Sequence, residues 1–133
     1  MREILFRGRL LDTNHYHYAG WVYGSLVYSP SEDHYYIIEH SDDELSYPVD
    51  KETIGQFTGL CDKNGTKIFE GDIVECQTRK GKGVAPIVFE KGKFCAKWFE
   101  ENWKQYFYYE INSKFKVIGN IYDNPELLGD DND

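Results

Sequence analysis

TGLCDKNGTKIFEGDIV, residues 58–74, is the stretch that decides the fold of this chain. It reads as the end of a strand, an Asn-Gly pair at residues 64–65, and an apolar run that returns as far as Gly71 and Asp72. Asn-Gly between two such runs is the strongest short-range signal for a β-hairpin, because both central residues of a type I′ turn need a positive φ. We therefore predict a hairpin whose turn is Lys63–Thr66.

Further strands are predicted on both sides of this hairpin, at spacings of about eight to twelve residues. Gly, Pro or Asn turns separate them, and the 17% aromatic content suits a pleated surface. The predicted strands cover residues 3–11, 21–28 with a break at Gly24, 35–39, 47–49, 54–58, 67–69, 73–76, 84–89, 94–99 and 115–122. Residues 100–114 fit either a strand or a short helix. Pro86 is expected only at a sheet edge or bulge.

This pattern predicts an all-β fold, a barrel or roll rather than alternating α/β units. We expect an N-terminal β-meander over residues 1–52 and a small SH3-like barrel over residues 53–133, which ends in an acidic tail. A short helical turn follows Asn124, because Pro125 suits the first helical position and its predecessor then adopts an N-cap conformation. Leu127 and Leu128 are expected to plug the end of the barrel.

Composition favours a protein that stays in a reducing compartment. The three cysteines, Cys61, Cys76 and Cys95, form no Cys-x-x-Cys pair, and Cys95 lies in an apolar alternation typical of a buried residue. No run of about 18 apolar residues occurs, and charges interrupt the first eight residues, unlike the apolar core of a signal peptide. We expect no membrane span and a location in the bacterial cytoplasm.

Charge is distributed unevenly along a chain whose net charge is −8. Residues 32–52 contain eight acidic side chains and one lysine, whereas residues 77–98 contain six basic side chains and one glutamate. Overall acidity opposes non-specific DNA binding, because most of the surface would repel phosphate. A local basic face is still compatible with a nucleic acid, and two oppositely charged lobes are equally compatible with simple solvation or with docking in an oligomer.

The chain resembles the YopX family of phage and prophage proteins over most of its length. The matching segments are residues 4–7, 21–24, 47–60, 68–74 and 117–128. The resemblance implies an SH3-like C-terminal region, a phage or prophage origin and no attributed enzymatic activity. It weakens over residues 77–114, and the basic hairpin Arg79–Lys82 lies where the family varies. Outside that range, Cys61 stands where the family more usually has a charged or polar residue.

Two patterns point towards catalysis, and both have a simpler interpretation. His15 and His17 share a strand face, and His34 and His40 would have to complete a metal shell, yet all four lie in or beside loops, where a histidine needs no such role. Glu70 and Asp72 form a carboxylate pair that a small hydrolase would need. The step from Glu70 to Asp72 also reads as a turn in which Asp72 accepts backbone N–H groups. No Rossmann fingerprint or phosphate-binding loop occurs, so we expect no cofactor.

A binding surface is the remaining candidate site. Aromatic rings and basic side chains alternate in the second half of the chain, and bases stack on such rings while cations contact phosphates. The candidate residues are Arg79, Lys80, Lys82, Lys91, Lys93, Trp98, Trp103, Tyr106 and Tyr108. The simpler interpretation is that these rings fill the core and the contact between the lobes.

From these observations we expect a non-enzymatic binding or accessory module, and the basic aromatic face makes nucleic acid a candidate ligand. The alternative is an acidic protein that mimics a nucleic acid and binds a basic site on a host protein. A hydrolase using the carboxylate pair is the more distant alternative. Self-association is also expected, because an edge strand such as Tyr35–Glu39 invites pairing with a second copy.

Overall fold

The computed structural model describes residues 3–11, 20–41, 43 and 45–129. It is an all-β protein with two antiparallel sheets, as the sequence predicts. The chain forms two compact units, Met1–Phe57 and Thr58–Asp133, each described below by itself. Its two helices are single 3₁₀ turns, and none of the helices in the described part has the length and apolarity needed to cross a membrane.

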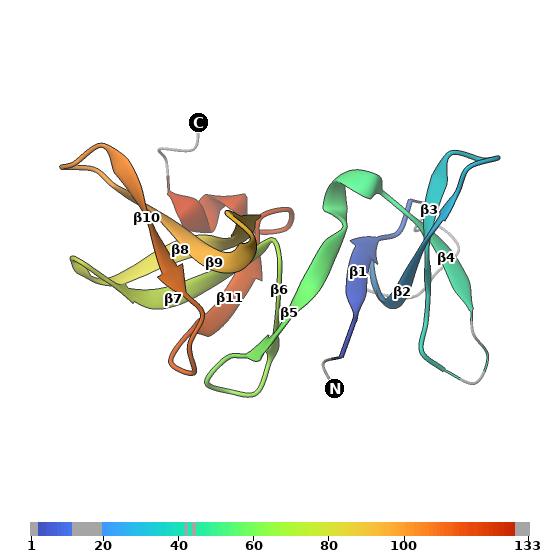
Figure 1. Ribbon diagram of the computed structural model, residues 1–133, viewed down its shortest axis with the longest axis horizontal. Helices are drawn as coiled ribbons and strands as arrows, with labels where there is room; N and C mark the ends of the chain where they lie inside the picture. The colour runs from blue at the N-terminus through green and yellow to red at the C-terminus, as the bar shows by residue number, and fades with distance from the viewer. Residues whose placement is uncertain (1–2, 12–19, 42, 44, 130–133) are drawn as a thin grey trace. The chain divides into compact units, whose positions relative to one another are not determined.

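The first unit is a β-meander extended by the start of one further strand (Figure 1). Its elements are β1 (Phe6–Arg9), β2 (Trp21–Ser29), β3 (His34–Ile38), β4 (Ser46–Val49), the 3₁₀ turn η1 (Lys51–Thr53) and the beginning of β5 (Gly55–Cys61). The strand order is β4-β3-β2-β1-β5. Its core consists of Leu10, Val22, Ile37, Tyr47 and Val49.

Strand β2 changes its pairing partner at Gly24. The strand pairs with β1 up to Gly24 and with β3 from Ser25 onward. A Cβ atom on Gly24 would lie 2.0 Å from the carbonyl oxygen of Ile38, so no other residue fits there without a backbone shift. The predicted break at Gly24 is therefore a change of partner within one continuous strand.

Strand β3 is an interior strand, which removes the reason given above for self-association. It pairs with β2 on one side and with β4 on the other, through contacts such as Tyr36 with Pro48. The prediction that Tyr35–Glu39 forms an open edge is wrong, because the short segment around Tyr47 pairs as a full strand. Self-association itself stays a prediction.

The second unit contains the end of β5 and six further strands. These are β6 (Lys67–Phe69), β7 (Asp72–Thr78), β8 (Gly81–Glu90), β9 (Lys93–Glu100), β10 (Gln105–Glu110) and β11 (Lys116–Asn120). Strand β6 neighbours β5, and the other five strands form a sheet in the order β10-β9-β8-β7-β11. Residues 105–110, compatible with either structure from sequence, thus form a strand. The core of the unit consists of Ile68, Val74, Cys76, Ala85, Ile87, Ala96 and Phe115.

The β5–β6 turn has the predicted position but a different geometry. Gly65 has a φ of +84°, whereas Asn64 does not have a positive φ. The Gly65 N–H donates to the Asp62 carbonyl oxygen, and the Asp62 N–H to that of Thr66. This is a type I turn followed by a left-handed glycine, the three-residue hairpin loop, rather than type I′. The Asp62 side chain selects it by accepting the N–H groups of Asn64 and Thr66.

The predicted SH3-like barrel is not confirmed, because the second unit shows no closed barrel. In the five-stranded sheet the end strands β10 and β11 do not pair with each other. Strand β8 bends the sheet by pairing with β7 as far as Pro86 and with β9 from Ile87. Pro86 therefore lies in an interior strand, contrary to expectation, at the point where the strand changes partners.

The C-terminal turn is the 3₁₀ helix η2 (Pro125–Leu128), as predicted, but Asn124 does not cap it through its side chain. The Asn124 side-chain oxygen instead accepts the N–H of Asn120 at 3.1 Å. Leu128 lines a surface groove beside Val84, and Leu127 remains 36% exposed. These leucines cover one side of β8 and β11 rather than plugging a barrel.

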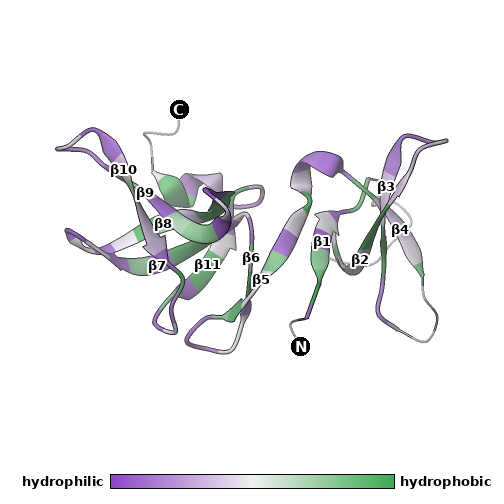
Figure 2. Cartoon of the chain, in the orientation of Figure 1, coloured by the Kyte–Doolittle hydropathy of each residue, from purple (hydrophilic) through white to green (hydrophobic). Residues whose placement is uncertain are grey.

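Hydropathy follows this architecture within the second unit. Figure 2 shows hydrophobic residues concentrated along the middle of β7 and β8 and hydrophilic residues at the hairpin ends. Cys95 is buried as predicted, and so is Cys76, whereas Cys61 is exposed. Burial raises the pKa of both buried thiols, which keeps them protonated at neutral pH.

Candidate functional site

Strands β9 and β10 present two faces of different character. Tyr108 lies opposite Lys97 and Tyr106 opposite Phe99, and residues directly opposite each other share a face. This set, together with Lys91, faces away from the core and is called the outer aromatic face. The alternate residues, which include Ala96, Trp98 and Tyr109, face the core of the unit.

An ion pair organises the outer aromatic face. Lys97 Nζ donates to Glu90 Oε2 at 2.8 Å, and the Tyr108 hydroxyl donates to Glu90 Oε1 at 3.0 Å. The hydrogen bond from Lys97 lowers the pKa of Glu90, and the same contact raises the pKa of Lys97. Partial burial and the Glu90 hydrogen bond raise the pKa of Tyr108, so its hydroxyl stays a donor.

Cations lie over the rings of this face. Lys97 Nζ is 4.6 Å from the centre of the Tyr106 ring, and Lys91 Nζ is 4.7 Å from that of Tyr108. The Phe99 and Tyr106 rings meet edge to face with centres 5.1 Å apart. Tyr106 is nevertheless 51% exposed and Phe99 43% exposed. Rings this exposed on a small protein are available for a ligand.

A groove of about 690 Å³ runs beside these rings. Its walls come from β8, from the β9–β10 hairpin and from Leu128 of η2. The lining residues are Val84, Pro86, Lys97, Trp98, Phe99, Glu101, Tyr106 and Leu128. Apolar walls beside one cation and one carboxylate suit a ligand with flat apolar surface and polar edges.

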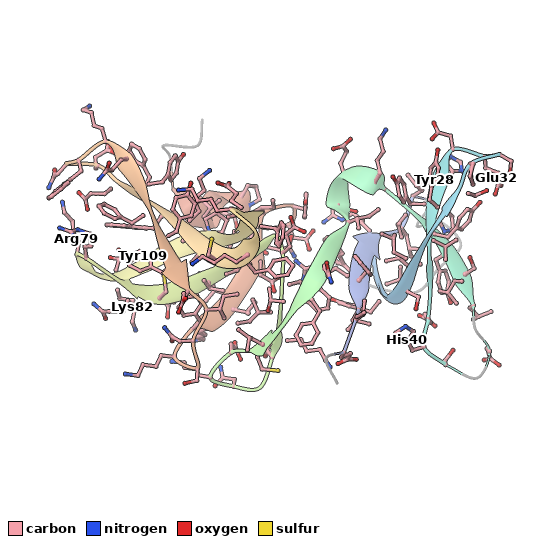
Figure 3. The ribbon with its side chains drawn as sticks, viewed as in Figure 1. Tyr28, Glu32, His40, Arg79, Lys82 and Tyr109 are labelled. Carbon is pink, nitrogen blue, oxygen red and sulfur yellow. The ribbon has the colours of Figure 1, made fainter. Side chains whose placement is uncertain are left out.

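A second cluster lies at the tip of the β7–β8 hairpin. The Arg79 guanidinium carbon is 4.9 Å from the centres of both the Trp103 and the Phe107 rings, and its backbone N–H donates to the Tyr109 hydroxyl at 3.0 Å. Figure 3 shows Arg79 and Lys82 on this hairpin. A pocket of about 390 Å³ opens here, lined by Arg79, Lys80, Glu100 and Trp103, and is called the tip pocket.

The structure divides the nine residues predicted from sequence among three places. Lys91, Tyr106 and Tyr108 belong to the outer aromatic face, and Lys93 lies near it, 4.0 Å from Glu110. Arg79, Lys80 and Trp103 line the tip pocket. Lys82 projects from the same hairpin and is 3.9 Å from Glu75. Trp98 packs against the core, as the simpler interpretation expected for the rings.

Phe99, Lys97 and Glu100 also belong to these clusters and are not among the nine residues predicted from the sequence. The alternation of side chains along β9 could have identified Lys97 and Phe99, because every second residue counted from Lys93 lies on the same face of the strand. Glu100 lies on the other face of β9 and is only 1% exposed. No sequence pattern marks it, since a buried carboxylate is recognised only from its surroundings.

Within the described residues, neither the histidines nor the carboxylate pair that pointed towards catalysis forms an assembled site. Asp72 is buried and its Oδ2 accepts the Phe69 N–H at 2.7 Å, which agrees with the turn interpretation. His40 forms a 2.7 Å hydrogen bond with the Ser25 hydroxyl, and His34 packs against Tyr36. No three His, Cys, Asp or Glu side chains in the described part are placed to hold a metal ion. His15 and His17 lie outside the described residues.

Comparisons with known proteins agree with this fold. The protein EF1440 from Enterococcus faecalis has a similar crystal structure, with a TM-score of 0.51 and 23% sequence identity over 96% of this chain and 99% of that one. At this identity the likeness concerns the fold alone. No curated protein matches the chain. The family model described as YopX protein matches residues 5–129. The chain therefore belongs to the YopX family.

Proposed function

We propose that this member of the YopX family is a binding module rather than an enzyme, and that it holds single-stranded nucleic acid on the second unit. The observation that carries the proposal is the outer aromatic face, where exposed rings alternate with cations on neighbouring strands. Bases stack on such rings without regard to sequence, and nearby cations contact the phosphates. A phage or prophage setting in a bacterial cytoplasm, which the resemblance implies, offers single strands during replication.

The electrostatics predict a modest dependence on salt. Carboxylates already pair with most of the basic side chains of residues 77–98. Lys80, Lys82, Lys93 and Lys97 each have a glutamate within 4.0 Å. Within the described residues, Arg79 and Lys91 have ring contacts and no carboxylate at ion-pair distance. Two phosphate contacts on a single strand give a slope of about −1.4 for the logarithm of affinity against the logarithm of salt concentration.

Fluorescence anisotropy with a labelled dT oligomer tests the proposal. We expect binding with the salt slope given above, and a loss of about 5-fold or more in Tyr106→Ala, because stacking on one ring contributes about 1–3 kcal/mol. Tyr28→Ala is the matched control, since Tyr28 is a tyrosine of similar exposure in the first unit. Equal affinities for the two variants, or no binding by the unmodified chain, would exclude this surface as a site for single strands.

The acidic mimic is retained as a second candidate because two carboxylates at the β2–β3 turn are held in place. The Tyr28 hydroxyl donates to Asp33 at 2.7 Å, and the Tyr36 hydroxyl donates to Glu32 at 3.1 Å. Figure 3 labels Tyr28 and Glu32 of this turn. The hydrogen bond to Asp33, with partial burial, raises the pKa of Tyr28. Ordered carboxylates on an exposed turn suit a basic partner surface. Capture of a basic host protein that survives nuclease treatment would favour this candidate.

A further inference from the structure

The tip pocket contains a buried carboxylate, an unusual feature for the end of an exposed hairpin. Glu100 closes β9, and its side chain is 1% exposed although Trp103, three residues later, is 60% exposed. Lys80 Nζ lies 3.3 Å from Glu100 Oε1, and the Asn102 N–H donates to the same oxygen at 2.9 Å. A charged group this buried needs partners, because its desolvation is costly.

Both of these contacts use one oxygen of Glu100. Within the described residues Oε2 has no protein donor, and Glu100 lines the tip pocket. The pocket therefore offers an acceptor at Oε2 directly beside a donor, the Lys80 ammonium. A ligand that complements it carries an N–H group next to an acceptor atom.

Arg79 and Trp103 supply the rest of the pocket. The guanidinium lies against the Trp103 and Phe107 rings, which orients it while its N–H groups remain outside any ion pair in the described residues. The Trp103 side chain is 60% exposed, so its ring can stack with a flat ligand. The volume of about 390 Å³ suits one aromatic bicycle rather than a larger group.

We propose that the tip pocket binds a single guanine base of the strand held by the second unit. Guanine presents its adjacent N1–H and N2–H donors to Glu100 Oε2, and its O6 and N7 atoms accept from Lys80 and Arg79 while the ring stacks on Trp103. Other bases lack the combination of two adjacent donors and two adjacent acceptors. This inference rests on the proposed function and adds base selectivity to it.

The test uses dT oligomers that differ in one central base, which is thymine, adenine, cytosine, guanine or inosine. We expect the guanine probe to bind about 10-fold more tightly than the all-thymine probe, because a good bidentate contact discriminates by about 1–3 kcal/mol. Inosine lacks the N2 amino group and should lose most of this preference. These probes need no change to the protein, so they test the pocket even where a variant fails to fold.

Glu100→Gln should abolish the guanine preference, measured as the ratio of the guanine and all-thymine affinities of the same variant, because an amide NH2 group cannot accept the guanine N–H groups while the amide oxygen still accepts the Asn102 N–H. Glu110→Gln is the matched control, because it removes one exposed carboxylate of the same sheet and should keep the preference. Equal binding of all five probes would overturn this inference and leave the proposed function standing. Failure of every probe to bind would overturn both.

Discussion

Asp62 connects two segments of the second unit through one buried side chain. Its Oδ1 accepts the N–H groups of Asn64 and Thr66, and its Oδ2 accepts the N–H of Val117, all at 2.9 Å. Burial alone would raise the pKa of this carboxyl, but the three hydrogen bonds outweigh it and the pKa is lowered. The residue therefore ties the β5–β6 turn to β11, 55 residues later in the chain.

Asp62→Asn should destabilise the second unit by about 1–3 kcal/mol at pH 7, because the amide cannot accept all three donors and leaves buried N–H groups unsatisfied. The folded-state pKa of Asp62 is lowered, so its contribution is present above the unfolded pKa, about 3.9, and is lost as the pH falls through the folded value. Urea unfolding at several pH values measures this.

The exposed Asp43→Asn substitution is the control and should change the free energy of unfolding little. The difference between Asp62→Asn and the unmodified chain should shrink below pH 4. A difference that is constant from pH 7 to pH 3 would show that the charge of Asp62 does not contribute.

At the scale of elements, a long strand in each unit changes partners part of the way along. Strand β2 does so at Gly24, and strand β8 does so between Pro86 and Ile87. Both positions are residues that fit a regular strand poorly, glycine for want of a side chain and proline for want of an N–H. The same residues mark where a sheet bends.

Gly24→Ala should destabilise the first unit by about 1–3 kcal/mol, because the new Cβ would overlap the Ile38 carbonyl and force a backbone shift. Thermal unfolding followed by circular dichroism measures the effect. Ser25→Ala, at the next position, is the control and should cost less than about 1 kcal/mol, since its hydroxyl contacts the exposed His40. Equal stability of the two variants would mean that the close approach at Gly24 is not required.

Local signals predicted the elements well, whereas pairing partners were not accessible from the sequence. The Asn-Gly turn, the proline after Asn124 and the alternation in β9 each act over a few residues, and each marks a real element. Whether β3 is an edge strand depends on its pairing with β4, and the sequence of β4 predicts only a short extended segment. Barrel closure depends on β10 and β11 meeting, and no local residue pattern decides that.

At the scale of the whole molecule, the acidic residues of the first half and the basic residues of the second half contact different kinds of side chain. Two carboxylates at the β2–β3 turn accept hydrogen bonds from tyrosine hydroxyls. In the second unit, by contrast, four lysines each lie within 4.0 Å of a glutamate: Lys80, Lys82, Lys93 and Lys97. The sequence predicted a basic aromatic face from rings and basic side chains that lie close together in the second half of the chain. The proposed binding surface depends less on net charge than on exposed rings, because most of its lysines lie beside a glutamate.

The most direct measurement is an NMR titration of the isotopically labelled chain with a short single-stranded DNA oligomer. The proposal predicts shift changes confined to the amides of the β7–β8 tip, β9 and β10, with Arg79, Phe99 and Tyr106 among the most affected. Shift changes centred on the β2–β3 turn, or none at a saturating oligomer concentration, would contradict it.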